Sequence, residues 1–179
     1  MTKASEIYGQ SLYDLAAEEG LSEEIMDQME AVKGILSDNP DYVTLLLEPS
    51  IPRKERLRLL DEAFEDSIHP YLKNFLKILI ERGLLREFGG CYRKYRSSYH
   101  KDHGITEAAV TAAVPLSEAE LSRLKEKLEQ LSGKKVLMNF RQDENVLGGI
   151  RVELEGRLYD GTVKGRLDDL RKKVNETVL

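Results

Sequence analysis

The chain has 179 residues, of which 41% are hydrophobic and 33% are charged, and this composition is typical of a soluble globular protein. Its net charge of −5 argues against a nucleic-acid-binding protein, because neutralising phosphates requires a surplus of Lys and Arg. Cys91 is the single cysteine, and no apolar run has the length of a signal peptide or a membrane span, so we expect no intramolecular disulfide and a cytoplasmic location.

The first 104 residues have an apolar periodicity that predicts six short helices. In each segment apolar residues recur at steps of three and four, which places them on one stripe of a helix. The expected segments are 7–16, 25–36, 42–46, 52–64, 70–80 and 85–99. Pro52 and Pro70 suit the first turns of two of them, because a first-turn N–H has no intrahelical partner to lose. Short connections between the segments predict an N-terminal six-helix antiparallel bundle in residues 1–104.

After Gly104 the sequence changes to an alternating pattern that predicts strands. The expected strands are 105–114, 136–140 and 150–154. Ser117 and Glu120 have the spacing of a capping box at the start of a helix, and helical spacing returns over residues 163–174. Residues 105–179 are therefore predicted to form a small C-terminal α/β module, which makes the fold a two-domain combination of an α part and an α/β part.

Three short patterns resemble chemical sites but lack essential parts. His100, Asp102 and His103 lie close together, yet no Cys or further His completes a set of metal ligands. Residues 132–135 resemble the end of a phosphate-binding loop, yet they lack its leading glycine and the hydroxyl after the lysine. Cys91 has no predicted base beside it. We therefore predict no catalytic residue, no metal and no cofactor.

Gly148 and Gly149 resemble half of a dinucleotide-binding fingerprint. They precede a strand instead of opening a helix, and no third glycine follows at the required step. We interpret the pair as a turn that needs positive φ or close backbone contact.

The first and fifth predicted helices carry more apolar residues than one buried stripe needs. The adjacent apolar pairs are Ile7 with Tyr8, Phe75 with Leu76, and Leu79 with Ile80. All of these residues are first of all candidates for the core. A surplus of this kind would also suit a groove for a partner's amphipathic helix, and periodicity alone leaves both interpretations open.

Residues 136–170 follow a specific order of strand, diglycine turn, strand and helix. The residues that define this order are Val136, Asp143, Val146, Gly148, Gly149, Ile150, Val152, Asp160, Gly161, Thr162, Leu167 and Leu170. The order resembles the signature of the F-type ATP synthase delta subunit family, the bacterial counterpart of the mitochondrial oligomycin-sensitivity-conferring protein. The resemblance extends over the whole chain, with departures at Gly9 and Ser11, where alanine is usual, at Gln142, where an apolar residue is usual, and at Thr162, where serine is usual.

The resemblance implies a non-catalytic stator subunit of the peripheral stalk. Such a subunit links the catalytic head to the membrane-anchored b subunits, so that proton-driven rotation is coupled to ATP synthesis. Residues 1–104 would bind the N-terminal helix of an alpha subunit, and residues 105–179 would face the C-terminal end of a b subunit. The expected partner-binding residues, on the first and fifth helices, are Tyr8, Ser11, Leu12, Leu15, Phe75, Ile78 and Leu79. The implied location is peripheral, on the cytoplasmic side of the bacterial cell membrane, with no insertion into the bilayer.

Two alternatives remain at this point. One is a small enzyme that handles a phosphorylated ligand at the diglycine turn, and it predicts converging polar groups there. The other is a general helical adaptor, which the N-terminal half suggests. The adaptor leaves the signature in residues 136–170 unexplained.

Overall fold

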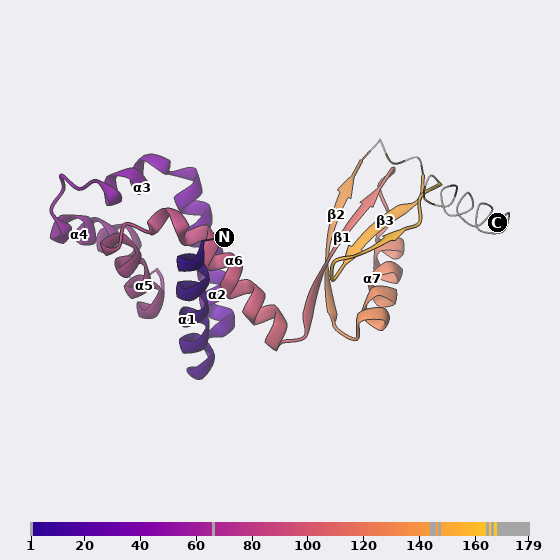
Figure 1. Cartoon of the computed structure of the whole chain (residues 1–179), viewed down its shortest axis with the longest axis horizontal. Helices are drawn as coiled ribbons and strands as arrows, with labels where there is room; N and C mark the ends of the chain where they lie inside the picture. The colour runs from indigo at the N-terminus through magenta and orange to yellow at the C-terminus, as the bar shows by residue number, and fades with distance from the viewer. Residues whose placement is uncertain are drawn as a thin grey trace, which may run out of the picture. The chain divides into compact units, whose positions relative to one another are not determined.

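The computed structural model describes residues 2–65, 67–143, 146, 148–163, 165 and 167, and the chain divides into two compact units, Met1–His100 and Lys101–Leu179 (Figure 1). The first unit is helical and the second carries a β-sheet, so the predicted combination of an α part and an α/β part is confirmed. Two residues of the predicted last helix, Leu170 and Val174, lie outside the described residues. Among the described residues, no helix has the length and apolarity needed to cross a bilayer.

Seven helical segments make up the first part of the chain. They are α1 (Lys3–Glu18), α2 (Ser22–Asp38), α3 (Pro40–Leu47), α4 (Arg53–Phe64), α5 (Pro70–Glu81), the 3-10 helix η1 (Leu85–Glu87) and α6 (Phe88–Asp102). Capping side chains and prolines define where several of these helices begin. The Thr2 hydroxyl caps α1 by accepting the Ser5 N–H, and Pro40 and Pro70 occupy first-turn positions of α3 and α5. The sixth predicted helix therefore begins as a 3-10 turn.

The core of the first unit is formed by the inward stripes of these helices. Its fully buried side chains include Ile25, Met29, Leu46, Leu60, Leu72, Leu76, Leu79, Ile80 and Tyr95. Tyr95 of α6 donates its hydroxyl hydrogen bond to the Ser22 carbonyl oxygen at 2.9 Å, and its ring meets Tyr13 edge-on at a centroid distance of 5.3 Å. These two contacts attach α6 to α1 and to the start of α2.

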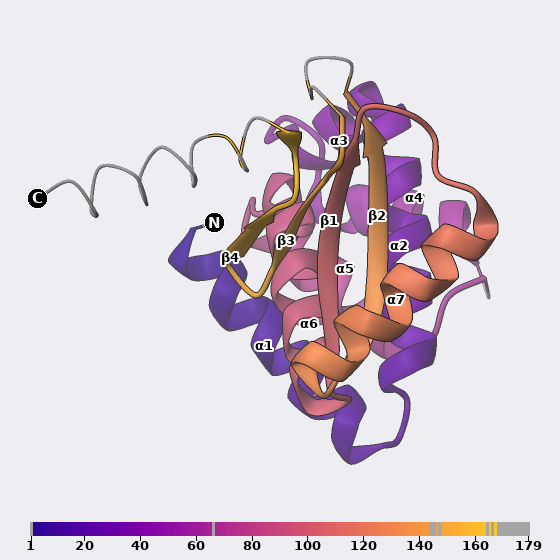
Figure 2. The same ribbon diagram turned by 90° about the vertical axis from the view of Figure 1, so that its right-hand side faces the viewer.

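The described residues of the second unit include a four-stranded sheet and a helix that packs against it. Its elements are β1 (Ile105–Ala112), α7 (Glu118–Ser132), β2 (Lys135–Gln142), β3 (Ile150–Leu154) and β4 (Arg157–Asp160). The strand order is β2-β1-β3-β4; β1 is parallel to β2 and antiparallel to β3 (Figure 2). The capping box predicted at Ser117 and Glu120 is confirmed, and Gly133 ends α7 in the left-handed conformation.

One face of the sheet packs against α7. The buried cluster consists of Ala108, Val110, Leu128, Val136, Val152 and Leu154. Alternate residues of β1 are buried, and two of them are alanines, so α7 can approach the centre of the sheet closely. The sequence does not predict strand β4, because its four residues are too few for a periodic signal.

Candidate functional site

Exposed apolar side chains concentrate on α1 and α5, two helices that contact each other. The large exposed apolar residues of the first unit are Ile7, Leu15, Ile35, Leu45 and Ile78. Three of these lie on α1 and α5: Ile7 is 56% exposed, Leu15 39% and Ile78 44%. These two helices therefore provide the apolar surface that a partner helix would need.

The partner-binding residues expected from the sequence fall into two groups. Tyr8 is half-buried, and Ser11, Leu15 and Ile78 are exposed, so these four side chains reach the surface. The other three, Leu12, Phe75 and Leu79, are 4%, 6% and 0% exposed and belong to the core. Ile7, which the sequence indicates only as part of the apolar surplus, is the most exposed of all these apolar residues.

The diglycine turn is filled by the chain's own backbone. Gly148 and Gly149 have φ of 67° and 82°, in the region that favours glycine. A Cβ atom on Gly149 would lie 2.4 Å from the Gly161 carbonyl oxygen and 2.9 Å from Thr162 Cα. The Gly161 N–H also donates to the Ile150 carbonyl oxygen at 2.9 Å. Close approach at Gly149 therefore serves contact between two segments of this chain.

Asp160 and Thr162 connect β4 to the helical residues that follow. The Asp160 carboxylate accepts the Thr162 N–H at 3.0 Å and pairs with Arg151 at 3.2 Å. The hydrogen bond from Thr162, together with Arg151, lowers the pKa of the Asp160 carboxyl. The Thr162 hydroxyl accepts the Gly165 N–H at 3.0 Å, which is the geometry of a helix N-cap. These polar groups are engaged in local structure.

The remaining signature residues are structural in their positions. Val136 and Val152 are 0% and 5% exposed and lie in the core under α7, while Val146 is 9% exposed. The Asp143 N–H donates to the Ala112 carbonyl oxygen at 3.0 Å, which extends the pairing of β2 with β1 by one residue. Ile150 begins β3 and packs against the same core.

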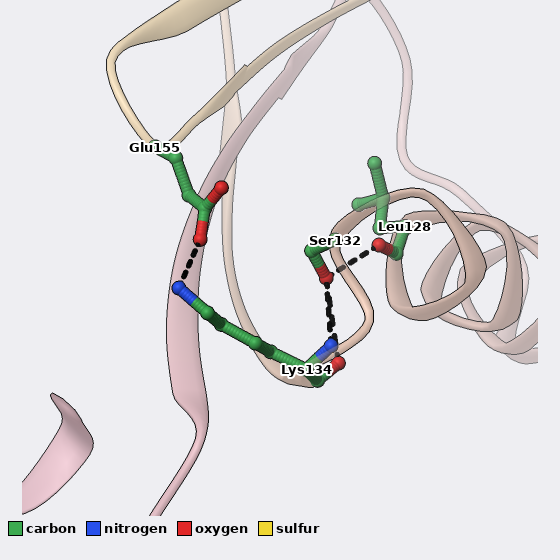
Figure 3. Close-up of polar contacts among 4 residues, drawn as sticks. All are labelled: Leu128, Ser132, Lys134 and Glu155. Atoms are coloured by element: carbon green, nitrogen blue, oxygen red, sulfur yellow. Dashed lines mark hydrogen bonds and ion pairs between the residues drawn. The ribbon is translucent and has the colours of Figure 1, made fainter. Parts of the chain in front are cut away.

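The segment that resembles a phosphate-binding loop is also occupied by internal contacts (Figure 3). The Lys134 ammonium pairs with the Glu155 carboxylate at 2.6 Å. The Ser132 hydroxyl donates to the Leu128 carbonyl oxygen at 2.8 Å, as a side chain does in the last turn of a helix. The lysine that would attract phosphate is therefore paired with a carboxylate that would repel it.

The two other patterns considered from the sequence, the single cysteine and the histidine cluster, also lack the arrangement of a chemical site. Cys91 is fully buried in α6, and burial raises the pKa of its thiol to about 11, which leaves little thiolate at neutral pH. Among the described residues, no group of three or more His, Cys, Asp or Glu side chains is arranged to hold a metal ion. His100, one of the residues first considered for a metal, is 9% exposed at the end of α6.

Comparison with known proteins agrees with the signature. The family model described as ATP synthase delta (OSCP) subunit matches residues 4–174. The ATP synthase subunit delta of Halalkalibacterium halodurans is 31% identical over 168 residues, which cover 93% of this chain and 92% of the relative. The Brevibacillus brevis subunit of the same name is 31% identical over 166 residues, covering 93% of this chain and 95% of that one.

A solved structure supports the fold over the same length. A chain in the Toxoplasma gondii mitochondrial ATP synthase hexamer superposes with a TM-score of 0.69 and 18% identity. The match covers 97% of this chain and 98% of that one, so it includes both units. The family match, the relatives and the signature geometry agree, and the chain belongs to the ATP synthase delta (OSCP) subunit family.

Proposed function

We propose that the exposed apolar face of α1 and α5 binds the N-terminal helix of an alpha subunit and so attaches the stator to the catalytic head. The observation that carries this proposal is the concentration of Ile7, Leu15 and Ile78 on two contacting helices. Leu12, Phe75 and Leu79 are buried on the same two helices and would support this face from within the core. In the proposed arrangement, the six α-helices of residues 1–104 form one antiparallel bundle that keeps this face rigid.

As a family member, the chain is a non-catalytic peripheral-stalk subunit of an F-type ATP synthase. A subunit in this position must resist the torque that rotation of the central shaft exerts on the head. Exposed ion pairs contribute only about 0–1 kcal/mol each, whereas fully burying one large aliphatic side chain contributes about 1.5–3 kcal/mol. An apolar helix-binding face is therefore better suited to this load than a set of surface ion pairs.

The C-terminal module, residues 105–179, is proposed to meet the C-terminal end of a b subunit. This assignment places the chain between the head and the membrane-anchored part of the enzyme. The corresponding location is peripheral, on the cytoplasmic side of the bacterial cell membrane. What supports the assignment is the family membership together with the separation of the chain into two compact units.

The helix-binding face is tested by titrating the whole chain with a synthetic peptide that copies the N-terminal helix of its cognate alpha subunit. Ile78→Asp places a carboxylate in the proposed interface, and we expect it to raise the Kd measured by calorimetry at least about tenfold. Ile35→Asp is the matched control, because Ile35 is equally exposed (45% against 44%) but lies on α2. Leu79 is unsuitable for this test, since a carboxylate at a fully buried position would unfold the unit.

The control decides how the result is interpreted. We expect Ile35→Asp to bind the peptide within about twofold of the unsubstituted chain, because Ile35 lies on α2, outside the proposed α1 and α5 face, and residues outside an interface contribute little to binding. Absence of heat with the unsubstituted chain at two well-separated temperatures would rule out the α1 and α5 face as the peptide site, because apolar burial has a large heat-capacity change and cannot be thermally silent at both. Equal weakening by both substitutions would point to a general effect of surface charge.

A further inference from the structure

Strand β2 forms one edge of the sheet, since the order is β2-β1-β3-β4 and β2 pairs with β1 on one side (Figure 2). The hydrogen bonds at its two ends show which backbone groups point to β1. The Lys135 N–H donates to the Gly104 carbonyl oxygen at 2.9 Å, and the Asp143 N–H donates to the Ala112 carbonyl oxygen at 3.0 Å. Backbone groups of residues two apart point the same way along a strand. The backbone N–H and C=O groups of the odd-numbered residues of β2 therefore point to β1, and those of the even-numbered residues point outward from the edge of the sheet.

The outward-facing backbone groups belong to Val136, Met138, Phe140 and Gln142. The Val136 N–H already has a partner within the chain, because it donates to the Glu129 carboxylate of α7 at 3.0 Å. Within the described part of the chain, no other strand pairs with Met138 and Phe140 on this side. Two N–H donors and two carbonyl acceptors are thus aligned in the middle of an eight-residue strand that contains no proline.

The side chains of β2 indicate what kind of strand would bind there. Lys135 and Arg141 are exposed, and the strand contains no carboxylate. Antiparallel pairing of β2 with a second copy, centred on Met138, would place Lys135 directly opposite Arg141 of the other copy. Like charges in directly opposite positions destabilise a strand pair. The charges therefore disfavour self-association and favour an acidic segment.

We propose that β2 binds an extended, acidic segment of another ATP synthase subunit, which adds to the sheet as a fifth strand. The proposal rests on the proposed function of this module as a partner-facing part of the stator. Backbone hydrogen bonds to Met138 and Phe140 would hold the segment, and carboxylates would pair with Lys135 and Arg141. Phe140 is 38% exposed on the side of the sheet that α7 covers, so it offers an apolar contact to the neighbouring side chain that the segment places on that side.

Amide hydrogen exchange tests the proposal residue by residue. The chain is labelled alone and within the assembled ATP synthase, and the amides are measured by mass spectrometry with residue-level fragmentation. We expect exchange at Met138 and Phe140 to slow at least about tenfold in the assembled enzyme, because their N–H groups gain acceptors there. Leu137 and Asn139 serve as internal controls, since their N–H groups face β1 and should exchange slowly in both samples. Equal exchange of Met138 and Phe140 in the two samples would overturn the proposal.

Charge reversal tests the acidic character of the segment. The double substitution Lys135→Glu with Arg141→Glu should remove most of the added protection, while Lys127→Glu, an exposed change on α7, should leave it unchanged. Protection that survives the double substitution would exclude an acidic partner. Protection that appears in the isolated chain as its concentration rises would instead assign the edge to a second copy. Recovery of the chain with the purified enzyme is measured in the same samples and reports separately on the proposed function.

Discussion

Gly9 of α1 contacts the backbone of Cys91 in α6 so closely that a Cβ atom on Gly9 would lie 2.5 Å from the Cys91 carbonyl oxygen and 2.9 Å from Lys94 Cβ. Alanine at this position would need α6 to move away from α1. The same pair of helices carries the Tyr13–Tyr95 ring contact and the hydrogen bond from Ser98 to Gln10. Gly9 therefore allows the short distance between α6 and α1, and α1 is one of the two helices of the proposed binding face.

We expect Gly9→Ala to lower the free energy of unfolding by about 1–3 kcal/mol, the usual cost of overpacking a close contact. Gly34→Ala is the matched control, because Gly34 lies within α2 and a Cβ atom there would meet nothing within 4 Å. That change should stabilise the chain by about 0.5–1 kcal/mol through helix propensity. Urea unfolding of both variants measures the difference. A stabilising Gly9→Ala would show that α1 and α6 can separate at little cost.

At the signature turn, we expect Gly149→Ala to destabilise the second unit by more than Gly156→Ala. Both glycines have positive φ, so each substitution carries a backbone cost of about 1–2 kcal/mol. Only Gly149 adds a steric conflict, since its Cβ would meet the Gly161 carbonyl oxygen, whereas nothing lies within 4 Å at Gly156. Thermal unfolding followed by circular dichroism should show the larger loss for Gly149→Ala. Equal losses would mean that the contact with Gly161 contributes nothing.

The Cys91 thiol should react with iodoacetamide only slowly in the folded protein. Burial, followed by the nearby Glu87 carboxylate, raises its pKa from 9.0 to about 11, and this leaves about 100-fold less thiolate at pH 8. The side chain is also 0% exposed. Mass spectrometry at fixed times should find modification in urea-unfolded chain long before it appears in the folded chain. Similar rates in both states would show that α6 opens readily.

Stability should fall at alkaline pH, in part through Tyr95. Burial raises the pKa of Tyr95 above its ordinary value of 10.0, so the folded state keeps a proton that the unfolded chain loses. The stabilisation is complete below about pH 10 and declines as the pH rises toward the folded-state pKa. Urea unfolding between pH 8 and pH 11 measures this decline. Tyr95→Phe should cost about 1 kcal/mol at neutral pH for the lost hydrogen bond, and it should make the alkaline decline shallower. An unchanged slope would exclude Tyr95 as its source.

The sequence predicts elements correctly where a periodic pattern and an end signal coincide. Ser117 and Glu120 identify the start of α7, and the apolar periodicity locates α5. Strand β4 escapes prediction because its residues Arg157–Asp160 alternate too briefly, and it forms only through its pairing with β3. The parallel pairing of β1 with β2 also depends on contacts between distant residues, which periodicity along the chain does not contain.

For the proposed binding face, the sequence predicts which helices carry exposed apolar residues better than it predicts which of their side chains are exposed. Ile78 and Leu79 are adjacent and both apolar, yet the structure exposes 44% of one and none of the other. Which of two neighbours faces the core depends on the angle at which α5 packs, and that angle depends on the whole unit. Tyr8, Ser11, Leu15 and Ile78 reach the surface as expected for a contact, while the other expected residues contribute to the core.

The capping box at Ser117 and the left-handed Gly133 give α7 a definite length of 15 residues. At 1.5 Å per residue the helix measures roughly 22 Å, close to the roughly 26 Å of the eight-residue strands β1 and β2 that it joins. The length of α7 is thus matched to the length of the two strands that it connects. One residue inserted in α7 before Leu128 would turn every later side chain by about 100° and move Leu128 out of the core. Insertions and deletions in this module are therefore expected in its turns, because a change of length there leaves the register of the strands and of α7 unchanged.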